Sequence, residues 1–218
     1  MILSALQGGP DELLPAIIAY CIIVLVCFPI HEFGHAWVAT RLGDHVAADQ
    51  GRVTLNPAAH IDPFGAILLA IGGFGWARPV PFIPSNLRKA PSISVGIILV
   101  SIAGIVMNLS LAIIAALPFR FHLVSVFDLT NTQSVAYILY LIIAINITLA
   151  IFNLIPIPPL DGSKILESIL PPQFQGVMTF LNQYGFYLLI LLFILPGNFL
   201  GQLISPLQFG LLRLFIGF

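Results

Sequence analysis

Long apolar stretches alternate with short polar ones along this chain, and four of them are long enough to cross, or nearly cross, a lipid bilayer. A helix rises about 1.5 Å per residue, so about 20 apolar residues span a hydrocarbon core about 30 Å thick. A fifth stretch contains Pro206 and Arg213 and could equally lie in the membrane interface. The expected spans are residues 13–42, 93–117, 135–152 and 180–195, with 199–218 as the possible fifth.

A shorter apolar stretch, residues 64–76, predicts a re-entrant or interfacial element, because it is too short to span as a helix. The residues on either side of it, 52–56 and 79–82, resemble short strands punctuated by proline. Strands at membrane depth persist only where protein buries them or where they line a wet cavity. The expected fold class is therefore mainly α. We expect a polytopic membrane protein with a helical transmembrane core and a short membrane-associated β-hairpin or sheet after the first helix.

The composition agrees with an integral, multi-pass membrane protein. Hydrophobic residues make up 59% of the 218 residues and charged residues only 8%, whereas soluble domains carry about 25% charged residues. The net charge of −1 and the lack of a polybasic cluster argue against a nucleic-acid partner and leave the lipid bilayer as the expected surroundings. Residues 1–12 contain no Lys or Arg and no small-residue cleavage site, so they do not predict a removable signal peptide.

Basic residues predict the orientation of the chain in the membrane. Five of the eight Lys and Arg residues fall within residues 41–89, and none precedes Arg41. Since Lys and Arg accumulate in cytoplasmic loops, this segment is expected to face the cytoplasm and the N-terminus the opposite side. The first helix would then reach the cytoplasmic half of the membrane near residue 31.

One cluster of ionisable residues lies where such residues are costly. Residues 13–30 are uncharged, and His31, Glu32 and His35 follow directly on the same apolar helix. A carboxylate at the centre of a bilayer costs about 2.5–3.5 kcal/mol or more, so it indicates function. Residues four apart share one helix face, so the two imidazoles can bind one Zn²⁺ while Glu32 acts as general base on the attacking water. The alternative is a pair of hydrogen-bonded core histidines.

A third metal ligand is expected where the third span breaks. Prolines at positions 156, 158 and 159 cannot continue a regular helix, so the chain should unwind at membrane depth around a cavity or a site. Asp161 then lies at the restart of a helix, with Gly162 beside it. Catalytic zinc usually takes three protein ligands, and Asp161 would complete the set. Alternatively, Asp161 caps the helix that begins there, and one carboxylate could do both.

Together the two segments resemble the site-2 protease family of intramembrane zinc metalloproteases, in its compact prokaryotic branch. Residues 51–57, 60–63 and 75–81 are also similar to that branch, and residues 103–108 resemble a family segment Ala-Gly-Pro-x-x-Asn with Ile105 in place of the proline. The motifs that carry the resemblance are His31-Glu32-x-x-His35 and Asn153-x-x-Pro156-x-Pro158-x-x-Asp161-Gly162.

The resemblance implies one Zn²⁺ per chain, held by His31, His35 and Asp161, with Glu32 as the catalytic general base and no further cofactor. It implies hydrolysis of peptide bonds within or near the transmembrane segments of membrane-protein substrates, as in regulated intramembrane proteolysis, in a prokaryotic cell membrane. We expect a single transmembrane metalloprotease domain over residues 1–218, without PDZ or CBS modules. Asn153 would help to hold the substrate or the transition state, or it could equally satisfy backbone groups of the broken helix.

Two functions from other classes stay open at this point. A membrane transporter could carry zinc as cargo, but a transport site needs a continuous polar path, and the ionisable residues here cluster at one depth. A protein that binds membrane helices without cleaving them could keep the fold, but it would not need Glu32. The sequence indicates neither the identity of a substrate nor an oligomeric state.

Overall fold

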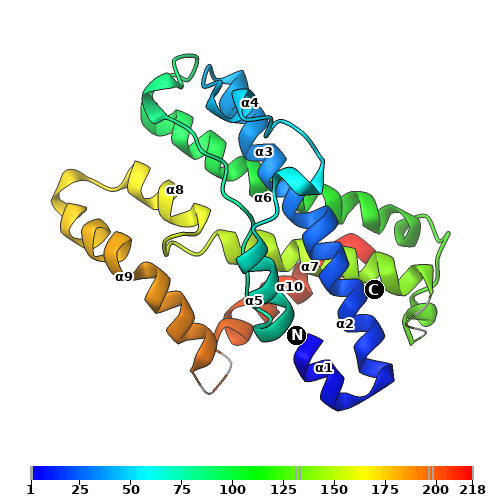
Figure 1. Cartoon of the computed structure of the whole chain (residues 1–218). Coiled ribbons are helices and arrows are strands. Elements are labelled where there is room, and N and C mark those ends of the chain that lie inside the picture. The colour runs from blue at the N-terminus through cyan, green and yellow to red at the C-terminus, as the bar shows by residue number, and fades with distance from the viewer. Residues whose placement is uncertain (1, 131, 133, 196, 198, 218) are drawn as a thin grey trace.

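The computed structural model describes residues 2–130, 132, 134–195, 197 and 199–217, and their regular structure is helical (Figure 1). Five helical segments in this part of the chain are long and apolar enough to cross a membrane, which confirms the polytopic helical fold: Glu12–Arg41, Ile93–Arg120, Val135–Asn153, Pro172–Ile194 and Phe199–Ile216. The α-helices are α1 (Ile2–Gly8), α2 (Pro10–Ile22), α3 (Phe28–Arg41), α4 (Val46–Asp49), α5 (Pro63–Gly72), α6 (Ile93–Arg120), α7 (Val135–Asn153), α8 (Asp161–Ile169), α9 (Gln175–Ile194) and α10 (Phe199–Ile216).

The first span is one continuous helix built from α2, a π-helical turn and α3. Pro29 has no N–H, and its ring would clash with the carbonyl one turn earlier in a regular α-helix. The wider turn at Ile23–Cys27, in which the Phe28 N–H bonds to the Ile23 carbonyl, takes up this mismatch. α3 then runs uninterrupted to Arg41 and presents the ionisable residues to the interior of the protein.

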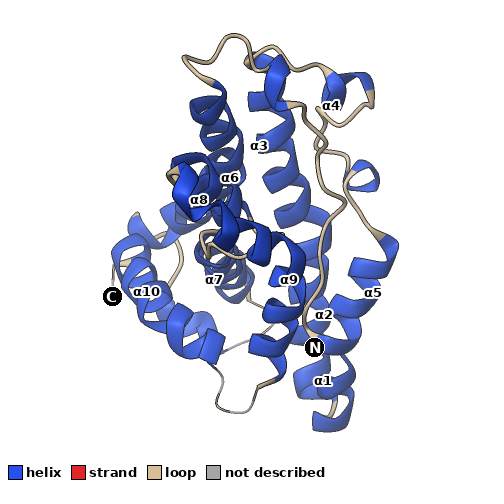
Figure 2. Cartoon of the chain, turned by 90° about the vertical axis from the view of Figure 1, so that its left-hand side faces the viewer, coloured by secondary structure: helices blue, strands red, loops and turns tan. Residues whose placement is uncertain are grey.

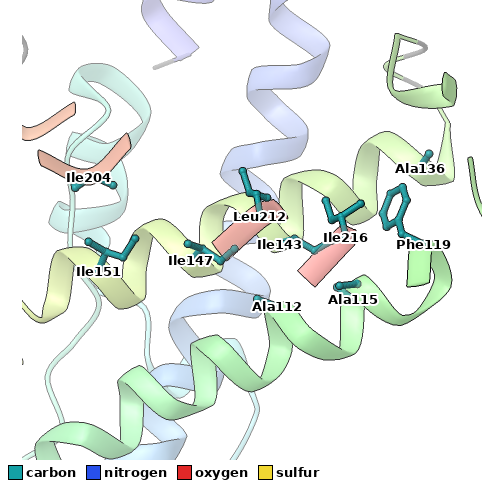
Figure 3. Close-up of a cluster of buried hydrophobic side chains, with 11 residues drawn as sticks. Ala112, Ala115, Phe119, Ala136, Ile143, Ile147, Ile151, Ile204, Leu212 and Ile216 are labelled. Atoms are coloured by element: carbon teal, nitrogen blue, oxygen red, sulfur yellow. The ribbon is translucent and has the colours of Figure 1, made fainter. Parts of the chain in front are cut away.

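α6 and α7 pack against each other, and α10 lies along them (Figure 1). Alanine side chains on α6 let its backbone approach its neighbours closely, as is typical of membrane helices. Isoleucines from α7 and α10 fill the remaining space (Figure 3). The cluster fixes the two helices that carry the buried polar residues described below, and it includes Ala112, Ala115, Phe119, Ala136, Ile143, Ile147, Ile151, Ile204, Leu212 and Ile216.

α5 and the chain after it form an element that extends along the first span and comes back. The Asp62 side chain caps α5 at its first turn. α5 lies beside α2, where the Tyr20 hydroxyl donates to the Ala66 carbonyl at 3.3 Å (Figures 1 and 2). The chain then returns in extended form over residues 73–83, here called the return segment, so that Ala77 pairs with Ile61. Both ends of the element lie together, so the chain enters it and leaves it at the same end of the first span.

The expected β-hairpin is wrong. Within the described residues, segments 52–56 and 79–82 form no strand, and the pairing of Ile61 with Ala77 is an isolated bridge (Figure 2). Prolines on and around both segments remove N–H groups that a ladder of backbone hydrogen bonds would use. The β-like residue types of these segments therefore give extended chain without a sheet.

Side chains satisfy the backbone of the return segment in place of a partner strand. The Val80 N–H donates to the Glu32 carboxylate at 3.1 Å, and the Ile83 N–H donates to the buried Asp44 carboxylate at 2.9 Å. Buried backbone groups need partners, and these carboxylates supply them. The bond to Glu32 holds the return segment against α3, beside His31 and His35, and the bond to Asp44 holds it against the loop that follows α3.

Candidate active site

His31 and His35 lie one helical turn apart on α3 and face α6. Both are nearly buried, with exposed fractions of 9% and 6%. Two glycines allow the helices to come so close. A Cβ atom at Gly34 would lie 2.7 Å from Cγ of Met107, and a Cβ atom at Gly104 would lie 2.5 Å from Nε2 of His35 and 2.7 Å from Nε2 of His31. The two imidazoles therefore occupy space that exists because position 104 carries no side chain.

The third candidate ligand comes from the break between α7 and α8. The chain leaves α7 at Asn153 and becomes helical again at Asp161, as the proline-rich segment predicted. Leu160 occupies the N-cap position of α8, and it makes no side-chain capping bond. The Asp161 carboxylate turns to the histidines instead, with Oδ2 3.2 Å from Nε2 of His31 and 3.1 Å from Nε2 of His35. The structure thus brings together the three residues that the two motifs single out.

Nε2 of His31, Nε2 of His35 and Oδ2 of Asp161 all present lone pairs to one another, so they need a shared cation. Nδ1 of His31 lies 2.6 Å from Oδ1 of Asn108, and Nδ1 of His35 lies 2.7 Å from the carbonyl oxygen of Val100. Both partners are acceptors, so both Nδ1 atoms carry a proton, and Nε2 of each neutral ring presents a lone pair. The two Nε2 atoms are 3.0 Å apart, and both face the Asp161 oxygen. Three acceptors at this spacing are stable only around a proton or a metal ion.

The dimensions of the cluster suit zinc. Ligands about 2.0–2.1 Å from a tetrahedral ion lie about 3.3 Å from one another. The three separations here are 3.0, 3.1 and 3.2 Å. Two imidazoles and one carboxylate are a ligand set that catalytic zinc accepts, with one position left for the reaction. His31, His35 and Asp161 therefore form a buried group that could hold one metal ion.

Lys164 contacts the other oxygen of Asp161. Its ammonium group lies 3.2 Å from Oδ1 and 5.8 Å from the ring centre of Phe82 in the return segment. The Lys164 ammonium favours the ionised form of the Asp161 carboxyl, and so would a cation held between Asp161 and the two histidines. The carboxylate is therefore ionised, with one oxygen toward the histidines and the other toward Lys164.

The return segment holds Glu32 in place. Oε2 of Glu32 accepts the Val80 N–H at 3.1 Å. The buried guanidinium of Arg52 donates to the carbonyls of Arg78 and Pro79, and so anchors the backbone directly before Val80. Burial lowers the pKa of Arg52, and the charge of Glu32 opposes this effect. Arg52 thus positions the chain that orients the Glu32 carboxylate.

One cavity of about 340 Å³ is lined by His31, Glu32, His35, Asp161 and Lys164. Its wall also contains aromatic side chains from the first span, the return segment, α7 and α9. Asn153 lines the same cavity, and its Nδ2 donates to the Leu149 carbonyl at 2.9 Å, so it satisfies a backbone group of α7 from a position beside the site. The aromatic residues of the wall include Phe28, Phe74, Trp76, Phe82, Phe152 and Phe186.

Three residues of the site are not identified by the motifs. Lys164 and Arg52 lie outside the spans. Arg52 falls within residues 51–57, which resemble the family, but that likeness gives it no role, and no spacing rule links either residue to the site. Asn146, in α7, is fully buried and bonds to Asn108. The sequence offers one signal for Asn146: it is a polar residue within an apolar span. Burying such a side chain in a membrane costs free energy, so its presence indicates a role.

Comparisons with known proteins agree with this geometry. Residues 121–192, which include the broken helix and Asp161, match Peptidase family M50. YwhC of Bacillus subtilis (strain 168), which carries the name of a proposed zinc metalloprotease, is 39% identical over 214 residues, 94% of this chain and 93% of that protein. Two proteins named as proposed zinc metalloprotease Rip2, from Mycolicibacterium smegmatis and Mycobacterium tuberculosis (strain H37Rv), are each 32% identical, over 79% and 81% of this chain and 65% and 68% of their own lengths. No solved structure matches the chain.

Proposed function

The chain belongs to peptidase family M50, the site-2 proteases, and from this premise we propose that it hydrolyses peptide bonds within or near the transmembrane segments of membrane-protein substrates. The protein is an intramembrane zinc metalloprotease, as its family, the names of related proteins and its own apolar helices indicate. We further propose that the protein acts in regulated intramembrane proteolysis and lies in a prokaryotic cell membrane. Residues 1–218 would form one catalytic domain. The relatives named above are bacterial.

In this proposal His31, His35 and Asp161 hold the zinc ion and Glu32 is the general base. Bound zinc would polarise the scissile carbonyl and lower the pKa of the attacking water. Glu32 accepts a proton from that water and then passes it to the leaving amine. The Val80 N–H keeps the Glu32 carboxylate facing the cavity.

Asn153 is proposed to contact the substrate backbone. Its amide nitrogen donates to its own helix at the Leu149 carbonyl, which leaves the side-chain oxygen as an acceptor at the cavity wall. An extended peptide offers N–H groups that such an oxygen can accept. The carboxamide would then hold the substrate without taking part in proton transfer.

One observation carries the proposal. Oδ2 of Asp161 lies within 3.2 Å of Nε2 of both histidines, and Glu32 lines the same cavity. A zinc ligand set beside a carboxylate base is the arrangement that metal-assisted hydrolysis requires. The cavity is bounded by membrane-spanning helices, so the peptide that reaches it comes from the membrane or its interface.

The substrate has to be extended where it is cut, because a helical peptide bond is shielded by its own helix. Residues 154–160 break the helical structure between α7 and α8 beside the cavity. Irregular backbone at this depth is tolerated where it lines a cavity that admits water. The break would therefore supply both the water for hydrolysis and room for an unwound segment.

The test is cleavage of single-span membrane proteins by the purified chain in liposomes, with and without a zinc chelator. We expect cleavage that the chelator abolishes and added Zn²⁺ restores, and no cleavage by Glu32→Gln. Zinc uptake into the same liposomes without cleavage of any substrate would favour a transporter instead. Cleavage that persists in the chelator and in Glu32→Gln would contradict the proposal.

A further inference from the structure

Asn146 is a carboxamide buried in the middle of an apolar span. It lies in α7, is fully buried and is not part of either motif. A polar side chain in such surroundings is stable only if its donors and acceptor are all bonded. The partners of Asn146 therefore show what it does.

The orientation of the Asn146 amide is fixed by its own helix. Nδ2 lies 2.8 Å from the carbonyl oxygen of Ile142 and 3.2 Å from the sulfur of Cys27. A carbonyl oxygen can only accept, so the atom that faces it must be the NH₂ group. Oδ1 of Asn146 must then point the other way, where Nδ2 of Asn108 lies 2.8 Å from it.

This orientation passes to Asn108 and from there to His31. Because Asn146 offers an oxygen, Asn108 must offer its NH₂ group to Asn146 and its own Oδ1 to Nδ1 of His31, at 2.6 Å. Nδ1 of His31 must therefore carry the proton, which leaves the Nε2 lone pair facing Asp161. A chain of three hydrogen bonds thus runs from the backbone of α7 to the imidazole on α3.

Both histidines carry a proton on Nδ1, but a different kind of acceptor holds that proton in each. Nδ1 of His35 faces the Val100 carbonyl directly, and a backbone carbonyl in a helix cannot turn round. Nδ1 of His31 faces a side-chain amide, which can rotate by half a turn and offer NH₂ instead of oxygen. With the amide reversed, His31 would carry its proton on Nε2 and could not bind a metal there. His31 therefore needs an anchor that His35 does not.

We propose that Asn146 is a positioning residue for the zinc ligand His31: it locks the Asn108 carboxamide so that His31 stays in the tautomer that binds metal. The inference rests on the proposed function, in which His31 holds zinc. Partners behind a metal-binding histidine fix its tautomer and orientation, and their loss lowers metal affinity by about 10–100-fold. Here that role is divided between two asparagines on two helices.

The experiment compares zinc affinity, by competition with a chelating dye, in the parent, Asn146→Leu, Asn146→Leu with Asn108→Asp, and Thr148→Val. Leu has nearly the shape of Asn but no hydrogen bonds, so we expect zinc affinity to fall by about 10–100-fold. A carboxylate at 108 can only accept, whichever way it turns, so Asn108→Asp should restore affinity without Asn146. Thr148 is the matched control: it also bonds polar groups from within α7, to Ala144 and Gln208, away from the metal ligands. Its replacement should leave zinc affinity unchanged.

A second measurement reads the tautomer itself. Nitrogen NMR of ¹⁵N-histidine-labelled, metal-free protein distinguishes a proton on Nδ1 from a proton on Nε2. We expect the Nδ1 proton of His31 to be present in the parent and lost in Asn146→Leu, wherever the proton shared by the two Nε2 atoms and Asp161 lies, while His35 keeps its Nδ1 proton and serves as an internal control. Asn146→Ala provides the same comparison if the leucine variant does not fold.

Each outcome has one meaning. Unchanged zinc affinity and an unchanged His31 tautomer in the Asn146 variants would overturn the inference. So would a loss of affinity that Asn108→Asp does not repair, because Asn146 would then act only through packing. A parent protein that binds no zinc, or that binds it as well after His31→Ala, would contradict the proposed function rather than the role of Asn146.

Discussion

Gly104 on α6 lies directly against His35 on α3: a Cβ atom at position 104 would come within 2.5 Å of the imidazole Nε2. Unbonded carbon and nitrogen atoms do not approach so closely, so any side chain there must displace the ring. If α6 moved away to make room, it would lose the close packing of the Ala103 carbonyl, in the residue before Gly104, against Gly34 of α3. The absence of a side chain at position 104 is therefore part of how the metal-binding group is built.

Gly104→Ala should disturb the metal-binding group while leaving the protein folded. The added methyl group would push His31 and His35 away from Asp161, and a displacement of about 1 Å can cost about 100-fold in rate. Zinc content and cleavage rate of the purified variant measure the effect. Gly210→Ala, in α10, is the matched control, because a Cβ atom there meets no atom within 4 Å. Equal zinc content in Gly104→Ala and the parent would contradict the close contact.

Glu32→Gln should retain zinc but lose proteolysis. The amide has the shape of the carboxylate but cannot take a proton from water, and loss of a general base costs about 10²–10⁴-fold in rate. His31→Ala should lose both zinc and activity, because it removes a ligand. Metal analysis and a cleavage assay on the same samples distinguish the two variants. Turnover close to that of the parent in Glu32→Gln would remove Glu32 from the role of base.

The helical spans and the break before Asp161 could be predicted from the sequence, because each rests on a strong local signal. Runs of apolar residues specify membrane helices, and the prolines at 156, 158 and 159 rule out a regular helix there. The four-residue spacing of His31 and His35 is a local signal too, because residues four apart lie on one face of a helix. These features need no knowledge of how the helices pack.

The β-hairpin was wrong because the partners of the return segment lie far away in sequence. Its residue types favour extended chain, and extended chain is what forms, but Glu32 and Asp44 bond to its N–H groups in place of a strand. The sequence does not predict the role proposed for Asn146 either, because that role depends on how α6 and α7 face α3. Such tertiary relationships leave no periodic pattern in the chain.

Arg52→Met should lower activity without removing zinc. Arg52 binds the carbonyls of Arg78 and Pro79, so its loss frees the backbone that holds Glu32 through Val80. Misplacement of the base should reduce the cleavage rate by about 10–100-fold, following the sensitivity of catalysis to positions near 1 Å. None of the contacts of Arg52 is with His31, His35 or Asp161, the proposed zinc ligands, so metal content should stay at the parent level.

The matched control for Arg52→Met is Arg88→Met, which removes an equal charge from an exposed position in the same loop. It should cleave substrate at the parent rate. If both arginine variants lose activity equally, the effect of Arg52 comes from the charge of the loop and not from its hold on the return segment. Loss of zinc from Arg52→Met would also contradict the prediction.

Lys164→Met should weaken zinc binding modestly, and Lys164→Arg should preserve it. The ammonium group neutralises the Asp161 oxygen that faces away from the histidines, at 3.2 Å, but its side chain is 41% exposed, so solvent screens the pair. We expect an affinity loss at or below the lower end of the roughly 10–100-fold range for partners of metal ligands. Competition titrations with a chelating dye measure it. A methionine variant that binds zinc as tightly as the parent would show that Lys164 does not support Asp161.

The orientation of the chain in the membrane is the last prediction. We expect the loop over residues 41–89 to face the cytoplasm, because it carries five of the eight Lys and Arg residues. The first span, Glu12–Arg41, has 30 residues and is about 45 Å long at about 1.5 Å per residue, more than a core of about 30 Å requires. His31 lies about 27 Å along this helix from residue 13, so an upright helix places the metal-binding group in the cytoplasmic half of the membrane, and tilt places it deeper.

Single cysteines at Lys89 and Glu12 test this orientation in sealed cells, in a background where Cys21 and Cys27 are replaced by serine. Serine at position 27 keeps an acceptor for the Asn146 amide, so the helices should pack as in the parent. A thiol reagent that cannot cross the membrane should label the cysteine at position 12 from outside, and the cysteine at position 89 only after the cells are opened. The reverse pattern would place the cavity in the outer half of the membrane. Cleavage would then free the outer part of a substrate instead of a cytoplasmic fragment, so the labelling result also decides which product a signalling role could use.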